Sequence, residues 1–157
     1  MRESPLHGKG VFAARLIPAE TTLLDYRGLR ISPEEADARH PVNPDDPWHT
    51  FYFSLSNGMI IDGGRRGNDA RWINHSCAPN CEARENTQGT RVFIVALRDI
   101  QPGEELFFDY GLVMEGRITR TLREAYRCLC GAPECRGTML ALPKRRSRQS
   151  RPKRDST

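Results

Sequence analysis

The chain has 157 residues, of which 38% are hydrophobic and 28% charged, so it can bury the core of one ordinary domain without disulfides. It contains no run of eighteen apolar residues, and its first ten residues lack the apolar centre of a signal peptide, which argues against a membrane-spanning helix and against export. The net charge of +4 is unevenly spread, because residues 144–157 hold seven basic residues and one acidic residue and leave −2 for residues 1–143.

Short strands are expected along most of the chain, because turn residues recur every eight to twelve positions between short apolar or alternating runs. Neither an alternation of strands and long helices nor a glycine-rich dinucleotide fingerprint is present, so the pattern predicts a mainly β protein. The expected strands are Gly10–Ala14, Thr22–Ile31, Phe51–Leu55, Met59–Asp62, Cys81–Glu85, Arg91–Leu97 and Glu105–Phe108.

Two short helices are expected between these strands. The first starts in SPEEADAR, where Ser32 can cap the helix, the following proline suits the first helical position and Glu35 completes a capping box. The second covers Glu115–Tyr126, where apolar residues recur four positions apart.

The five cysteines favour a metal site or catalysis over disulfides, because their number is odd and no export signal is present. Three of them form a C-x-C-x4-C pattern in CLCGAPEC, at Cys128, Cys130 and Cys135. A tetrahedral zinc site needs a fourth ligand, and only Cys77 and Cys81 remain to supply a thiol. The alternative is three free cysteines in a glycine- and proline-rich loop.

The segment RWINHSCAPNC allows a second interpretation, a Cys77 nucleophile with His75 as its base. Two residues apart on an extended strand, these side chains would share a face. No orienting third group or oxyanion device follows, which disfavours this interpretation.

Five motifs in order resemble those of the SET-domain protein lysine methyltransferases. They are HGKGVFA, DYRG, GNDARWINHSCAPNC, LRDIQPGEELFFDYG and CLCGAPECRGTML, and they cover residues 5 to about 140. The resemblance implies a β-clip-like fold of small curved sheets, with short helices, a C-terminal zinc loop and a pseudoknot through which INHSC passes. It divides the chain into a SET domain at 5–112, a helical connector at 113–126, a post-SET zinc-binding segment at 127–143 and a disordered basic tail at 144–157.

The resemblance also implies that S-adenosylmethionine binds on one face of the domain and the target lysine on the other, with a narrow channel between them. Gly8 and Gly10 would let the backbone approach the cofactor closely, since glycine has no side chain. Phe51 stands where many relatives have a tyrosine near the cofactor. The residues implied to contact the cofactor are His7, Lys9, Gly10, Phe51, Asn74, His75 and Leu129.

The same resemblance implies roles for the remaining candidate residues. Members with this cysteine module take the fourth ligand of their structural Zn²⁺ from the NHSC cysteine, here Cys77, and not from Cys81. Tyr110 and Tyr26 match the tyrosines beside the reacting lysine amine. Phe108 matches a position where tyrosine restricts a methylated lysine and phenylalanine leaves room, which predicts di- or trimethylation.

The acidic balance of residues 1–143 favours a basic protein substrate, such as a histone tail, a histone-like protein or a ribosomal protein. We expect such a peptide to add as an extended strand beside Phe51–Leu55. The basic tail could contact nucleic acid or act as a nuclear address, and a membrane partner is not expected.

Two other functions compete with this one: a catalytically silent SET module that binds protein or nucleic acid, and a small nucleic-acid-binding zinc protein. The second lacks the C-x2-C and H-x3-H spacing. The arginine bias and compact length resemble a small bacterial member, hence a cytoplasmic protein, or a nuclear or chromatin-associated one in a eukaryotic cell.

Overall fold

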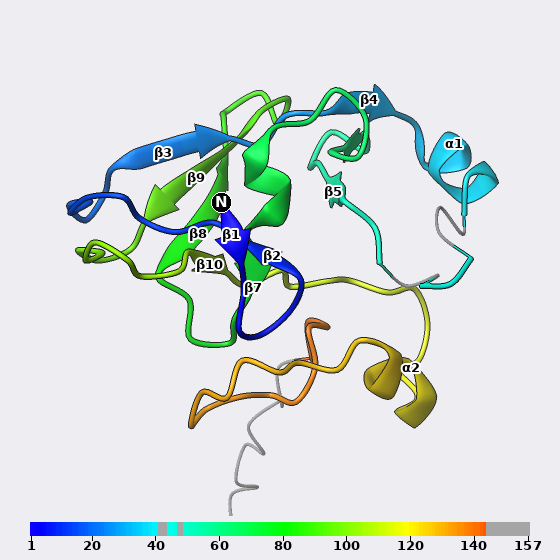
Figure 1. The fold of residues 1–157 in the computed structure, drawn as a ribbon. Coiled ribbons are helices and arrows are strands. Elements are labelled where there is room, and N and C mark those ends of the chain that lie inside the picture. The colour runs from blue at the N-terminus through cyan, green and yellow to red at the C-terminus, as the bar shows by residue number, and fades with distance from the viewer. Residues whose placement is uncertain (41–43, 47–48, 144–157) are drawn as a thin grey trace, which may run out of the picture.

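The computed structural model describes residues 1–40, 44–46 and 49–143, and within these residues the mainly β prediction is confirmed (Figure 1). No helix of this part of the chain has both the length and the apolar character needed to cross a bilayer. The elements in chain order are β1 (Arg2–Glu3), β2 (Lys9–Gly10), β3 (Thr22–Asp25), β4 (Leu29–Ile31), α1 (Pro33–Ala38), β5 (Tyr52–Ser54), β6 (Ile60–Asp62), the 3-10 helix η1 (Asp69–Trp72), β7 (Asn74–His75), β8 (Cys81–Glu85), β9 (Val92–Ala96), β10 (Phe107–Phe108) and α2 (Arg120–Ala125).

The strands form four small sheets. Two are three-stranded and antiparallel, in the orders β3-β9-β8 and β4-β6-β5, and a third is the hairpin of β1 and β2. The fourth pairs β7 with β10 in parallel, although the two strands lie about thirty residues apart in the sequence. This pairing places the NHSC segment beside the FFDY segment, which is the first step in building the site.

The core centres on β9, because this strand lies between β3 and β8 and four of its five residues are buried. Val92, Ile94 and Ala96 have no exposed surface, and Cys81 of the neighbouring β8 has none either. Burying each large aliphatic side chain contributes about 1.5–3 kcal/mol. A continuous apolar run is what a fully buried strand requires.

Two predicted strands need correction. The expected strand Thr22–Ile31 is two strands of different sheets, β3 and β4, because the chain leaves one sheet for the other at Tyr26–Gly28. Gly28 packs against the backbone of Asp62, where an added Cβ would lie 2.4 Å from the carbonyl oxygen. The expected strand Gly10–Ala14 is also wrong over most of its length: β2 ends at Gly10, and only an isolated bridge at Phe12 continues it.

The helix predictions are confirmed in part. Ser32 caps α1, accepting from the Glu35 amide at 3.1 Å, while the Glu35 carboxylate accepts from the Ser32 amide at 2.9 Å. Helix α2 begins only after Thr119, which accepts from the Leu122 amide at 3.1 Å. The expected start at Glu115 is wrong because Gly116, with φ +80°, interrupts the helical backbone.

The C-terminal segment returns to the chain that follows the FFDY motif. Leu112 pairs in parallel with the fully buried Leu140, through hydrogen bonds from the Leu112 amide to Met139 and from the Ala141 amide to Leu112. Figure 1 shows this segment, yellow to orange, along one side of the sheets. It can therefore supply a wall of the site. The expected basic tail lies outside the described residues.

Candidate active site

One cavity of about 640 Å³ collects most of the predicted site residues. Its walls come from the turn before β2, from β5, from the segment around η1 and β7, and from the C-terminal segment. The volume lies within the range of pockets that enclose small-molecule ligands, roughly 300–1,000 Å³. The predicted residues that line it are His7, Lys9, Tyr26, Phe51, Asn74, His75, Phe108, Tyr110, Cys128, Leu129 and Cys130.

Gly10 is not among the residues that line this cavity. Its Cα instead faces the Glu105 carboxylate, where an added Cβ would lie 2.3 Å from Oε1. Gly8, with φ +48°, does line the cavity and adopts a backbone conformation that glycine tolerates best. The close approach at Gly10 is therefore to the protein's own carboxylate.

Asn74 ties the turn before β2 to the centre of the site. Its side-chain amide donates to the carbonyl oxygens of Lys9, at 2.9 Å, and His7, at 3.2 Å, and to Glu105 Oε1, at 2.9 Å. Hydrogen bonds to a carboxylate are stronger than neutral ones. One asparagine thus positions two predicted residues, His7 in the turn and Lys9 at the start of β2.

An aromatic and cationic group occupies one region of the cavity wall. The Phe51 and Trp72 rings meet edge to face, with centroids 4.9 Å apart, and Lys9 Nζ lies 4.9 Å from the Trp72 ring. The Arg71 guanidinium lies 5.0 Å from the same ring, and its Nε is buried without a hydrogen-bond partner. These two cations make this region suited to an anionic ligand group.

A second group of rings lines the cavity nearer to β10. The ring centroids are 5.4 Å apart for Tyr26 and Phe53, 6.4 Å for Phe53 and Phe108, and 4.9 Å for Phe108 and Tyr110. The Tyr26 hydroxyl donates to the Phe51 carbonyl at 2.9 Å, which fixes the chain just before β5. These rings form an apolar wall with few polar atoms, and such a wall disfavours a charged group.

Tyr110 is held at both ends. Its hydroxyl donates to the Ile73 carbonyl at 2.7 Å, and its amide donates to His75 Nδ1 at 3.0 Å. Burial raises the pKa of the Tyr110 hydroxyl well above its usual value. The side chain is thus a neutral phenol whose single proton is engaged, which leaves lone pairs of its oxygen as the free hydrogen-bonding sites.

His75 is buried and neutral. Burial lowers its pKa to about 4, against the opposing effect of nearby Asp109. Because Nδ1 accepts the Tyr110 amide, the ring proton lies on Nε2, which faces Cys77 Sγ at 3.5 Å. Burial, the largest of its influences, raises the pKa of the Cys77 thiol. This environment does not favour a Cys77 nucleophile.

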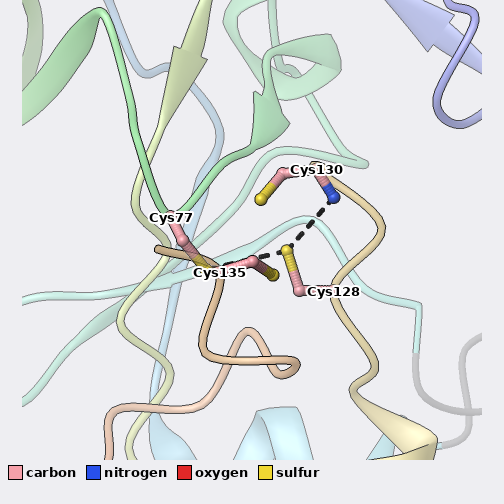
Figure 2. A group of neighbouring side chains, drawn as sticks. All are labelled: Cys77, Cys128, Cys130 and Cys135. Atoms are coloured by element: carbon pink, nitrogen blue, oxygen red, sulfur yellow. Dashed lines mark hydrogen bonds between the residues drawn. The ribbon is translucent and has the colours of Figure 1, made fainter. Parts of the chain in front are cut away.

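Cys77 instead belongs to a cluster of four thiols, together with Cys128, Cys130 and Cys135 (Figure 2). The four Sγ atoms lie within 4.8 Å of one another, and those of Cys77 and Cys128 are 3.7 Å apart. Cys81 is remote from the cluster, in β8, with its side chain in the core. The four residues could hold a metal ion and would then join the NHSC segment to the C-terminal segment.

The SET domain family matches residues 8–111, about two thirds of the chain and most of the cavity wall. The chain belongs to the SET-domain family. It is 38% identical over 133 residues to the histone-lysine N-methyltransferase Set2 of Drosophila melanogaster, covering 83% of this chain and 6% of that protein.

Two further SET-domain relatives give a similar picture. A histone-lysine N-methyltransferase of Schizosaccharomyces pombe, described as specific for lysine 4 of histone H3, is 39% identical over 85% of this chain and 14% of its own length. SETD2 of Mus musculus, also a histone-lysine N-methyltransferase, is 35% identical over 83% of this chain and 5% of its own length. This SET chain therefore spans only a small part of these relatives.

Sequence reasoning missed several residues of the cavity wall, among them Arg71, Trp72 and Phe53. The first two directly precede INHSC in the quoted motif, and their position there was the available signal. Phe53 lies within an expected strand, but nothing in the strand pattern distinguishes a ring in a site wall from a ring in the core.

Proposed function

We propose that this SET domain transfers methyl groups from S-adenosylmethionine to the side-chain amine of a lysine in a histone or another basic protein. The observation that carries the proposal is a cavity in which a cationic, aromatic region adjoins a wall of aromatic rings ending at Tyr110. The names of the relatives support the same activity.

The cationic region suits the proposed cofactor. Lys9 and Arg71 offer positive charge to its carboxylate, while Phe51 and Leu129 offer apolar surface to its adenine. Asn74 and His75 line the same cavity. When bound, S-adenosylmethionine supplies an electrophilic methyl group on a sulfonium.

The ring wall suits the target lysine, which must be neutral to attack. A free lysine has a pKa of about 10.4, so deprotonating it at pH 7 costs roughly 4–5 kcal/mol. Desolvation between the Tyr26, Phe53 and Phe108 rings lowers this cost, since burial disfavours the ammonium. Tyr110 offers oxygen lone pairs that can orient the amine. The proton that the lysine ammonium loses passes to water.

Phe108 should set the number of methyl groups. Its ring lies 4.9 Å from Tyr110 and has no hydroxyl to bind a water or the amine, which leaves room for di- or trimethyl-lysine. Phe108→Tyr is expected to shift the product toward monomethyl-lysine with little loss of the first methyl transfer. The measurement is the mass of a methylated peptide over time. A wild-type enzyme that stops at one methyl group, or a variant with unchanged products, would count against this role.

The substrate peptide is proposed to lie along β5. This strand is at the edge of its sheet in the order β4-β6-β5, and Tyr52 and Ser54 line the cavity. An exposed strand edge gives a peptide backbone affinity, while pockets beside it select side chains. The net charge of −2 on residues 1–143 favours a basic peptide.

The four-thiol cluster is proposed to hold structural zinc. Tetrahedral Zn–S bonds of about 2.3 Å place neighbouring sulfurs about 3.8 Å apart, close to the 3.7 Å between Cys77 and Cys128. A site closed by four thiolates has no open position for substrate. Because Cys128, Cys130 and Leu129 also line the cavity, the metal would stabilise a wall of the active site.

The experiment that tests the proposal is incubation with radiolabelled S-adenosylmethionine and mixed histones or a cell lysate. Labelled protein is the expected result. Cofactor binding without label would favour a silent SET module, and neither binding nor label would favour a small zinc protein. The tail 144–157 lies outside the described residues, so a nucleic-acid contact and a nuclear or cytoplasmic address stay predictions.

A further inference from the structure

Arg136 joins the cysteine segment to the FFDY strand by a contact that needs no metal. It follows Cys135 directly, and its guanidinium makes paired hydrogen bonds to Asp109, 2.6 Å from Nη1 to Oδ2 and 2.7 Å from Nη2 to Oδ1. The fork of an arginine matches a carboxylate in this geometry and fixes both its distance and its direction. Both side chains are partly shielded, at 24% and 37% exposed.

Asp109 directly precedes Tyr110, and its carboxylate also binds the backbone amide that follows Tyr110. Its Oδ1 accepts from the Gly111 amide at 2.9 Å, where Gly111 turns the chain with φ +50°. The same oxygen lies 3.5 Å from His75 Nδ1, the atom that accepts the Tyr110 amide. Both Oδ1 and Nδ1 are acceptors and form no hydrogen bond with each other, so the carboxylate is held by Gly111 and Arg136 and not by the ring.

We propose that Arg136 is a positioning residue for Tyr110. Its paired hydrogen bonds to Asp109 hold the backbone turn after Tyr110, and thereby the direction of the phenol, whether or not the thiol cluster is filled. The inference rests on the proposed methyl transfer for its kinetic consequence, because a small misplacement of a catalytic group can cost up to about a hundredfold in rate. Its geometric consequence does not depend on activity.

The kinetic test compares Arg136→Gln with Arg123→Gln, a matched change at an exposed arginine of α2 that does not line the cavity. Arg136→Gln is expected to lower kcat roughly tenfold or more while the peptide KM and the zinc content stay near wild type. Arg136→Lys should restore little, because an ammonium cannot make the paired contact. In a double-mutant cycle with Asp109→Asn, the double variant should be no slower than the slower single variant.

A second readout follows the geometry itself. The chain has four tyrosines, so a ¹⁵N-tyrosine spectrum is simple, and the Tyr110 signal is the one that Tyr110→Phe removes. We expect this amide signal to shift in Arg136→Gln and Asp109→Asn but not in Arg123→Gln.

Two results would overturn the positioning role by themselves: a Tyr110 amide signal that does not shift, or a wild-type kcat in Arg136→Gln. It would also be overturned by additive effects on kcat in the double-mutant cycle, or by a loss of bound zinc that matches the loss of rate. A wild-type protein that methylates nothing, with the shift present, would instead remove the proposed function and keep the positioning role. If Arg136→Gln fails to fold, Arg136→Lys and Asp109→Asn carry the same comparisons.

Discussion

Tyr110→Phe is expected to lower kcat for methyl transfer by about a hundredfold, the usual effect of removing one well-placed hydrogen-bonding group. The hydroxyl donates its only proton to the Ile73 carbonyl, so its oxygen can accept a hydrogen bond from the lysine amine. The ring contacts with Phe108 and His75 do not involve the hydroxyl, so the fold and the cofactor affinity should change little.

The contrast for this experiment is Tyr26→Phe. The Tyr26 hydroxyl donates to the Phe51 carbonyl and holds the chain that leads into β5, so its loss should raise the peptide KM more than it lowers kcat. The measurement is steady-state kinetics with peptide and cofactor varied separately. A Tyr110→Phe enzyme that keeps most of its kcat would remove the hydroxyl from the mechanism.

The pH dependence separates a positioning phenol from a phenolate base. Because burial raises the pKa of Tyr110, the phenol stays protonated across the neutral range and contributes no ionisation there. The rise of rate with pH should therefore reflect the lysine amine and survive, at a lower level, in Tyr110→Phe. A rise present in wild type and missing in the variant would point to Tyr110 as the base.

Cys77→Ser is expected to remove bound zinc and most of the activity. Removing one of the four thiolates should weaken zinc binding by more than the roughly 10–100-fold that is typical of changes to residues outside the metal ligands. Without the metal, Cys128, Leu129 and Cys130 lose the link that holds them at the cavity wall. Treatment with a strong chelator should have the same effect, since metal binding and local folding are linked.

The matched control is Cys81→Ser. This change places a hydroxyl where the side chain has no exposed surface, so it should lower the free energy of unfolding by about 1–3 kcal/mol yet leave zinc in place. The two variants are compared by zinc released per chain and by thermal unfolding. Zinc lost from Cys81→Ser and kept by Cys77→Ser would make the assignment of the fourth ligand wrong.

Local sequence patterns correctly predicted those elements whose structure depends mainly on residues close by in the sequence. The strand Cys81–Glu85 and the capping box of Ser32 and Glu35 are confirmed as expected, because a short strand between turn residues and a helix cap both depend on neighbouring residues. The strand Thr22–Ile31 was wrong because its break at Gly28 is set by the backbone of Asp62, far along the sequence.

The candidate site divides in the same way. The motifs, taken in their order, led to residues that line the cavity and to Cys77, which lies in the thiol cluster. The spacing of the cysteines alone did not distinguish Cys77 from Cys81 as the fourth member. The pairing of Arg136 with Asp109 could not be read from the sequence, since the two residues are 27 positions apart and no periodicity links a salt bridge across a folded loop.

The most direct test of the proposed function is tandem mass spectrometry of a histone labelled by the wild-type protein. We expect methyl groups on lysine side-chain nitrogens, with dimethyl- or trimethyl-lysine as the end product and almost none formed by Tyr110→Phe. Methylation of another residue type, or equal labelling by both proteins, would contradict it.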